Sequence, residues 1–74
     1  MSLPVACITG AGGGIGSRLA RELRATHAVR GLFRRDGPAA AAFAAAGGQV
    51  FLGDCTRAAG LEPFLAGADT VYHA

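Results

Sequence analysis

Apolar and polar residues alternate in blocks along this chain. Short apolar runs rich in branched side chains predict buried strands at residues 5–8, 28–33, 49–52 and 70–73. Apolar periodicity or high helix propensity predicts helices at residues 15–25, 39–46 and 58–65. Because strands and helices take turns along the whole chain, the expected fold class is α/β, with a parallel sheet joined by crossover helices.

A glycine run separates the first predicted strand from the first predicted helix. It reads Thr9-Gly10-Ala11-Gly12-Gly13-Gly14-Ile15-Gly16. Gly10 permits a tight turn with positive φ, Gly13 lets the backbone approach a ligand, and Gly16 lets helix and strand pack closely. A helix N-terminus carries free N–H groups and about half a positive charge, so the anion expected there is a pyrophosphate. The residues predicted to bind it are Gly10, Gly13, Gly14, Ile15 and Gly16.

Composition narrows the possible partners. The chain has 74 residues, room for at most one small domain, and a net charge of +2 carried by arginine, without any lysine. This charge suits an anionic cofactor, whereas the basic runs and interleaved aromatic residues of a nucleic-acid surface are absent from the sequence. The longest apolar stretch, residues 39–46, is too short to span a bilayer. Cys7 and Cys55 do not form a disulfide framework, so a cytoplasmic location is expected.

The glycine spacing resembles that of a known superfamily. It fits T-G-x-x-G-x-x-G through Gly13 and Gly16, and also T-G-x-x-x-G-x-G through Gly14 and Gly16. Both patterns are typical of short-chain dehydrogenases/reductases, the first of their extended and atypical members. Residues 29–34, 53–54 and 66–74 are similar to the same members. The resemblance implies the N-terminal part of a Rossmann doubly wound sheet, with three αβα layers and strand order 3-2-1-4.

The residues that follow the strands are the candidate cofactor contacts. Ligands of a doubly wound sheet bind beyond the carboxyl ends of its strands. Those ends are expected at Gly10, Arg34, Asp54 and Ala74. An arginine after the second strand pairs with a ribose 2′-phosphate, so Arg34 and Arg35 favour NADP. NAD stays an alternative, because a shift of two residues in the strand end would place Asp36 at the ribose.

The resemblance also implies roles at the third and fourth strands. The Asp54 carboxylate and the Cys55 N–H would contact the adenine ring, although Asp54 could instead form a turn that caps the next helix. His73 would make polar contacts around the cofactor cleft. An FAD-binding domain fits less well, because it would need an acidic residue where Arg34 stands.

Catalysis in the superfamily uses a tyrosine four residues before a lysine. This chain has no lysine, and its one tyrosine, Tyr72, is followed by only two residues. No catalytic residue and no metal ligand are therefore predicted. Two functions remain: the cofactor-binding segment of an oxidoreductase, epimerase or dehydratase, or a non-catalytic NAD(P)-sensing module. We expect residues 1–74 to be part of a longer domain, or to pair the exposed edge of the fourth strand with a second copy.

Overall fold

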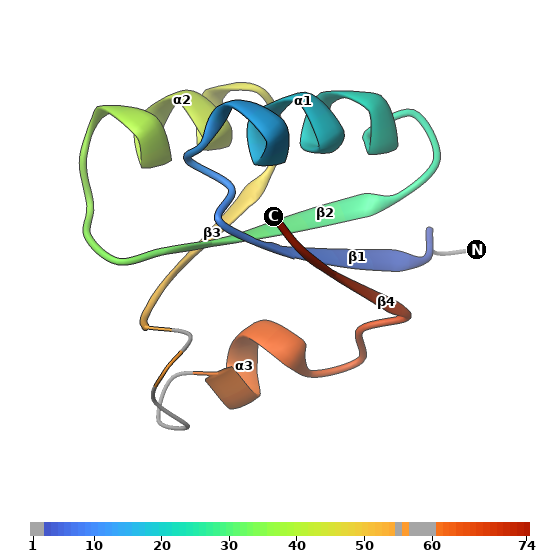
Figure 1. Cartoon of the computed structure of the whole chain (residues 1–74). Helices are drawn as coiled ribbons and strands as arrows, with labels where there is room; N and C mark the ends of the chain where they lie inside the picture. Colours follow the sequence, from blue (N-terminus) through green and yellow to red (C-terminus); the bar gives the residue numbers. More distant parts are fainter. Residues whose placement is uncertain (1–2, 55, 57–60) are drawn as a thin grey trace.

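The computed structural model of the protein describes residues 3–54, 56 and 61–74. Its elements follow one another as β1 (Val5–Thr9), α1 (Gly14–Leu23), β2 (Ala28–Phe33), α2 (Pro38–Ala45), β3 (Gln49–Leu52), α3 (Leu61–Leu65) and β4 (Thr70–His73). The four strands form one parallel sheet in the order β3-β2-β1-β4, with α1 and α2 on one face and α3 on the other (Figure 1). The predicted α/β class, Rossmann-like architecture and strand order are confirmed.

The element boundaries differ from the predicted ones mainly in the helices. Helix α1 ends at Leu23, before the predicted residue 25, because the Thr26 N–H bonds to the Leu23 carbonyl three residues back and interrupts the helical pattern. Helix α2 begins one residue early, at Pro38, where the fixed φ of proline suits the first helical position. Of the third predicted helix, the described part is Leu61–Leu65, and residues 58–60 lie outside the described residues.

The face of the sheet under α1 and α2 is packed with small residues. Its buried side chains are Ile8, Ala11, Ala20, Val29, Phe33 and Ala40. A Cβ atom at Gly31 or at Gly48 would lie only 2.8 or 2.6 Å from the ring of Phe43, which is too close for any real contact. The absent side chains therefore leave the space that the Phe43 ring fills, so that α2 can pack closely on β2.

The opposite face of the sheet is covered by the short helix α3, which side chains of the sheet hold by hydrogen bonds. The buried side chains between this face and α3 are Cys7, Leu32 and Phe64. The Arg30 guanidinium donates to the carbonyls of Phe64 at 2.9 Å and Ala66 at 2.6 Å, and the Cys7 thiol donates to the Phe64 carbonyl at 3.0 Å. These donors satisfy carbonyls at the end of α3 that have no partner within the helix. Burial raises the pKa of Cys7, so it stays a neutral thiol.

The last strand joins the sheet beside the first. The Asp69 carboxylate accepts a hydrogen bond from the Val5 N–H at 2.7 Å, and the Asp69 N–H donates to the Val5 carbonyl at 2.9 Å. These bonds align β4 with β1, so their carboxyl ends lie together. Across residues 3–54, 56 and 61–74, the helices are all too short or too polar to cross a membrane.

Candidate functional site

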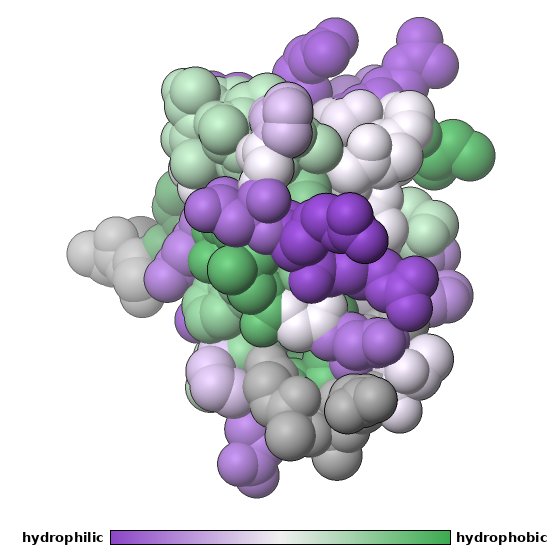
Figure 2. All heavy atoms as spheres, turned by 90° about the vertical axis from the view of Figure 1, so that its left-hand side faces the viewer, coloured by the Kyte–Doolittle hydropathy of each residue, from purple (hydrophilic) through white to green (hydrophobic). Residues whose placement is uncertain are grey.

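An open cleft of about 450 Å³ lies at the carboxyl edge of the sheet. Residues of β1, β2 and β4 and the segment that follows β3 contribute to it. Its lining includes Gly10, Gly13, Arg34, Asp54, Thr56, His73 and Ala74. Figure 2 looks onto this side of the molecule, where strongly hydrophilic residues lie beside apolar ones. The structure thus brings together the four strand-end residues singled out in the sequence, as the parallel sheet requires.

The glycine run forms a tight turn at one end of this cleft. Gly10 has a φ of +70°, and its carbonyl accepts a hydrogen bond from the Gly13 N–H at 3.0 Å. A Cβ atom at Gly16 would collide with the Gly10 carbonyl oxygen, and one at Gly10 would collide with the carbonyl oxygen of Ala74. The predicted left-handed turn and close helix packing are confirmed. The Gly13 N–H, however, is used inside the turn, so it is not one of the amides open to an anion.

The first turn of α1 provides the open amides instead. As the first residues of the helix, Gly14, Ile15 and Gly16 have N–H groups without an intrahelical partner. Gly13 in the N-cap position supplies no side-chain cap, and the first turn holds no acidic residue among those described. These three residues lie outside the lining of the cleft itself, at its glycine end. Their part in binding an anion stays a prediction.

Ile15, Leu19 and Leu23 recur at four-residue spacing, which predicts one apolar face of the helix, but the Ile15 side chain is not part of that face. It is 78% exposed, whereas Leu19 and Leu23 pack partly buried against the core. Gly16 and Ala20 are the buried residues of α1. The reason is the orientation of the helix, because α1 turns the face that carries Gly16 and Ala20 toward the core and Ile15 lies about 100° around the helix from Gly16.

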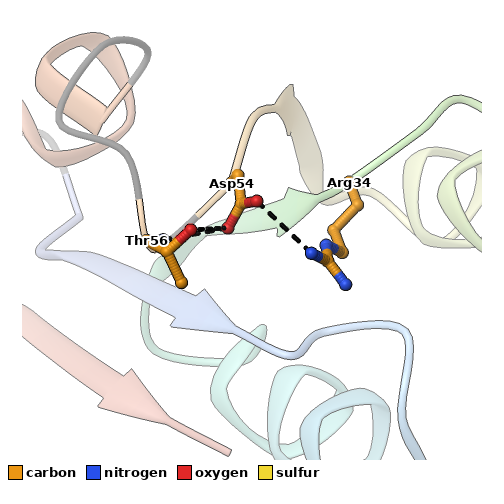
Figure 3. Close-up of polar contacts among 3 residues, drawn as sticks. All are labelled: Arg34, Asp54 and Thr56. Carbon is orange, nitrogen blue, oxygen red and sulfur yellow. Dashed lines mark hydrogen bonds and ion pairs between the residues drawn. The ribbon is translucent and has the colours of Figure 1, made fainter.

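Three side chains meet at the other end of the cleft (Figure 3). Arg34 Nη2 lies 3.3 Å from Asp54 Oδ2, while Asp54 Oδ1 accepts bonds from the Thr56 N–H at 2.9 Å and the Thr56 hydroxyl at 2.8 Å. The two bonds from Thr56, and then the Arg34 guanidinium, lower the pKa of Asp54 to about 2. Asp54 is therefore an ionised carboxylate that makes the turn considered in the sequence, and it also lines the cleft.

The remaining predicted contacts are placed less centrally. Strand β2 ends at Phe33, so Arg34 is the first residue beyond it, and Arg35 and Asp36 are exposed outside the cleft lining. Cys55, predicted to contact adenine through its N–H, lies outside the described residues. Within the described part of the chain, no group of three His, Cys, Asp or Glu residues could hold a metal ion.

Thr9 and His73 connect the ends of the two strands β1 and β4 inside the cleft. Thr9 Oγ1 lies 2.5 Å from His73 Nδ1, and the same hydroxyl is 3.5 Å from the Tyr72 carbonyl. The two residues are opposite each other in the register of the parallel pair. The contact holds the His73 ring at Thr9, and both residues line the cleft.

Sequence reasoning did not assign Thr56 to the site. The signal was present as Asp54-x-Thr56, a spacing at which an aspartate caps the backbone two residues on. Recognising that spacing would have indicated that the Asp54 side chain is held rather than free.

The geometry fits a dinucleotide. The turn at Gly10 and Gly16 has no room for side chains, and the start of α1 has N–H groups without an intrahelical partner. The basic side chain of Arg34 lies at the other end of the cleft. The fold and this cleft define a Rossmann-like nucleotide-binding segment. The model of the NAD(P)H-binding family matches residues 10–74, and the chain belongs to that family. Its cofactor is therefore a nicotinamide dinucleotide. No curated protein matches the chain significantly.

Proposed function

We propose that the chain is the NADP-binding segment of an oxidoreductase, epimerase or dehydratase of the extended short-chain dehydrogenase/reductase kind. The observation that carries the preference for NADP is Arg34. It is the first residue after β2, it lines the cleft, and its side chain is 81% exposed. A guanidinium at this place offers several N–H donors to a ribose 2′-phosphate, whereas a free 2′-hydroxyl needs an acceptor. Asp36, the acceptor that NAD would need, does not line the cleft.

Each end of the cleft holds a different part of the cofactor in this proposal. The amides of Gly14, Ile15 and Gly16 at the start of α1 bind the pyrophosphate, with the turn at Gly10 and Gly13 leaving room for it. When bound, NADP supplies or accepts a hydride.

At the opposite end, Arg34 and Arg35 bind the 2′-phosphate, and Asp54 with the Cys55 N–H contacts the adenine. The backbone of Ala74 closes the cleft beside Gly10, where its carbonyl already lies against the turn. Together these residues bind and orient the cofactor, and none of them performs a chemical step.

Calorimetric titration with NADPH and NADH tests the proposal. Arg34→Ala removes one or two charge-assisted hydrogen bonds, each worth about 1.5 to 3 kcal/mol, so NADPH binding should weaken at least about tenfold while NADH binding changes less than about twofold. Arg35→Ala should give a smaller loss in the same direction, because Arg35 lies outside the cleft lining.

The matched control is Arg21→Ala. Arg21 is exposed in the last turn of α1 and lies outside this cleft, and its replacement lowers the net charge by the same amount. It should alter both affinities equally and slightly. An equal response of wild type and Arg34→Ala to both cofactors would remove the 2′-phosphate assignment, and absence of binding to either cofactor would overturn the proposal as a whole.

A non-catalytic NAD(P)-sensing module is the second candidate function. It is favoured by one feature of the sequence: its 74 residues hold no lysine, and therefore no Tyr-x-x-x-Lys dyad. The isolated chain should bind cofactor without turning over any carbonyl substrate. A Tyr-x-x-x-Lys segment elsewhere in the encoded protein would decide for the enzyme.

We also propose a cytoplasmic location, as expected for a chain whose two cysteines do not form a disulfide framework.

We propose in addition that the chain self-associates along β4, where Val71 is 53% exposed. Strand β4 lies at the edge of the sheet, and an exposed edge is a template for pairing with another strand. Analytical ultracentrifugation should show dimers at high concentration. A stable monomer throughout the concentration range would contradict this association.

A further inference from the structure

A chain of three side chains runs from the end of β2 to the segment after β3, along one wall of the cleft (Figure 3). Thr56 makes two hydrogen bonds to a single oxygen of Asp54, one from its N–H at 2.9 Å and one from its hydroxyl at 2.8 Å. Two donors on one oxygen fix the rotation of the carboxyl group. The other oxygen, Oδ2, is thereby directed at Arg34.

Arg34 keeps most of its hydrogen-bonding capacity in this arrangement. A guanidinium has five N–H donors, and the 3.3 Å contact with Asp54 engages one terminal nitrogen, Nη2. The side chain is otherwise 81% exposed. An exposed arginine without a tether samples many rotamers, and a ligand that binds it must bear the loss of that freedom. A tether that leaves donors free reduces this loss.

The Asp54 charge also repels a phosphate, so two effects oppose each other. Repulsion between the Asp54 carboxylate and a phosphate in the open cleft is screened by solvent and salt. Orientation of the guanidinium, in contrast, acts directly on its hydrogen bonds to the phosphate, because charge-assisted hydrogen bonds depend strongly on the alignment of donor and acceptor. In the structure the guanidinium contacts Asp54 at 3.3 Å while the side chain stays 81% exposed, so one nitrogen is held and the other donors stay open to a phosphate, which favours orientation as the larger effect.

We propose that Thr56 and Asp54 are positioning residues that order the Arg34 guanidinium for a ribose 2′-phosphate, and so set the preference for NADP over NAD. This inference rests on the proposed function. It gives Asp54 a role beyond contact with adenine, and it gives Thr56 a role that its sequence position alone does not indicate.

The test is the ratio of NADPH to NADH affinity, measured by calorimetry on the full chain. Both cofactors carry the same adenine, so a lost adenine contact cancels in the ratio and a lost orientation of Arg34 does not. Asp54→Asn should lower the ratio about three- to tenfold, and Thr56→Val about twofold. Thr56→Ser keeps both donors and should retain the wild-type ratio. In an Arg34→Ala background, Asp54→Asn should leave the ratio unchanged.

A second readout needs no cofactor. In a carboxyl-carbon NMR titration of the free chain, Thr56→Val should raise the pKa of Asp54 above its value of about 2, and Thr56→Ser should not. Thermal unfolding followed by circular dichroism establishes that each variant is folded. An Asp54 pKa that Thr56→Val does not change would show that the Thr56 hydroxyl does not hold the carboxyl group, and it would overturn the inference.

The binding outcomes separate this inference from the proposed function. If Asp54→Asn leaves the ratio unchanged, Asp54 does not position Arg34. If Asp54→Asn raises the ratio, Asp54 competes with the phosphate instead, and the inference is likewise overturned. In both cases the proposed function stands. If the wild-type chain binds neither cofactor, the proposed function fails and the positioning role fails with it.

Discussion

The two ends of the cleft differ in whether backbone or side chains form their surface. At the glycine end the shape comes from backbone, and a Cβ atom at Gly10 or Gly16 would collide with carbonyl oxygens. At the other end the shape comes from exposed or half-exposed side chains, Arg34, Asp54 and Thr56. This difference indicates which positions tolerate amino-acid substitution. Added atoms should damage the glycine end together with the fold, while the side-chain end should allow changes in cofactor preference with the fold intact.

The largest expected effect is that of Gly16→Ala. The new Cβ would meet the Gly10 carbonyl carbon at 2.9 Å and Ala11 Cα at 3.0 Å, both backbone atoms that can move only with the whole turn. Overpacking of this kind costs about 1 to 3 kcal/mol, a large part of the roughly 3 to 5 kcal/mol that a core of this size supplies. Urea unfolding should show the loss, and cofactor binding should weaken with it.

Gly14→Ala is the matched control for that change. Gly14 lies two residues earlier in the same helix, and a Cβ atom there meets nothing within 4 Å. The substitution should leave stability unchanged or raise it by about 0.5 to 1 kcal/mol, because alanine favours helix. Equal destabilisation by the two alanines would show that the close packing at Gly16 is not what limits the glycine end.

Gly10→Ala should have the next largest effect. Its φ of +70° is a left-handed conformation that costs an alanine about 1 to 2 kcal/mol, and the new Cβ would also collide with the Ala74 carbonyl. Gly67→Ala separates the two contributions, because Gly67 has a φ of +73° and open space around it. Denaturant unfolding should show a greater loss for Gly10→Ala. Equal losses would mean that the collision with Ala74 is relieved at no cost.

The smallest expected effect lies at the side-chain end and depends on pH. Asp54 has a pKa of about 2 in the folded chain against 3.8 for an unperturbed aspartate, so the unfolded state binds more protons between these values. The stability that Asp54 contributes is present above about pH 4 and is lost as the pH falls toward 2. Asp54→Asn should flatten this part of the acid-unfolding curve. If stability fell equally with pH in the variant and the wild type, the hydrogen bonds from Thr56 would not lower the pKa of Asp54.

Much of the fold could be predicted because its signals are local. The three strands at residues 28–33, 49–52 and 70–73 have the bounds that their apolar runs indicate. The positive φ of Gly10 and the close packing at Gly16 also follow from residue type and spacing. In each case a few neighbouring residues decide the structure.

The rest depends on contacts that spacing does not encode. Ile15 has the period of a core residue, but α1 buries the face that carries Gly16 and Ala20 instead. The sequence predicts that the Gly13 N–H is free to bind an anion, but it donates a hydrogen bond to the Gly10 carbonyl within the turn. Arg34 and Asp54 each follow a different strand in the sequence, whereas their contact requires β2 and β3 to end side by side. Three-dimensional arrangement, rather than residue type, decided these features.

The pairing of β1 with both β2 and β4 sets an order of assembly. Val5 pairs with Ala28 in β2, but it reaches Asp69 only across 64 residues of chain. Closing the longer loop costs more chain entropy, so β4 should dock after the β1-β2 unit has formed. The glycine turn could then form early, while the wall made by His73 and Ala74 would be completed last. In native-state hydrogen exchange, the amides that join β4 to β1 should open before those that join β1 to β2.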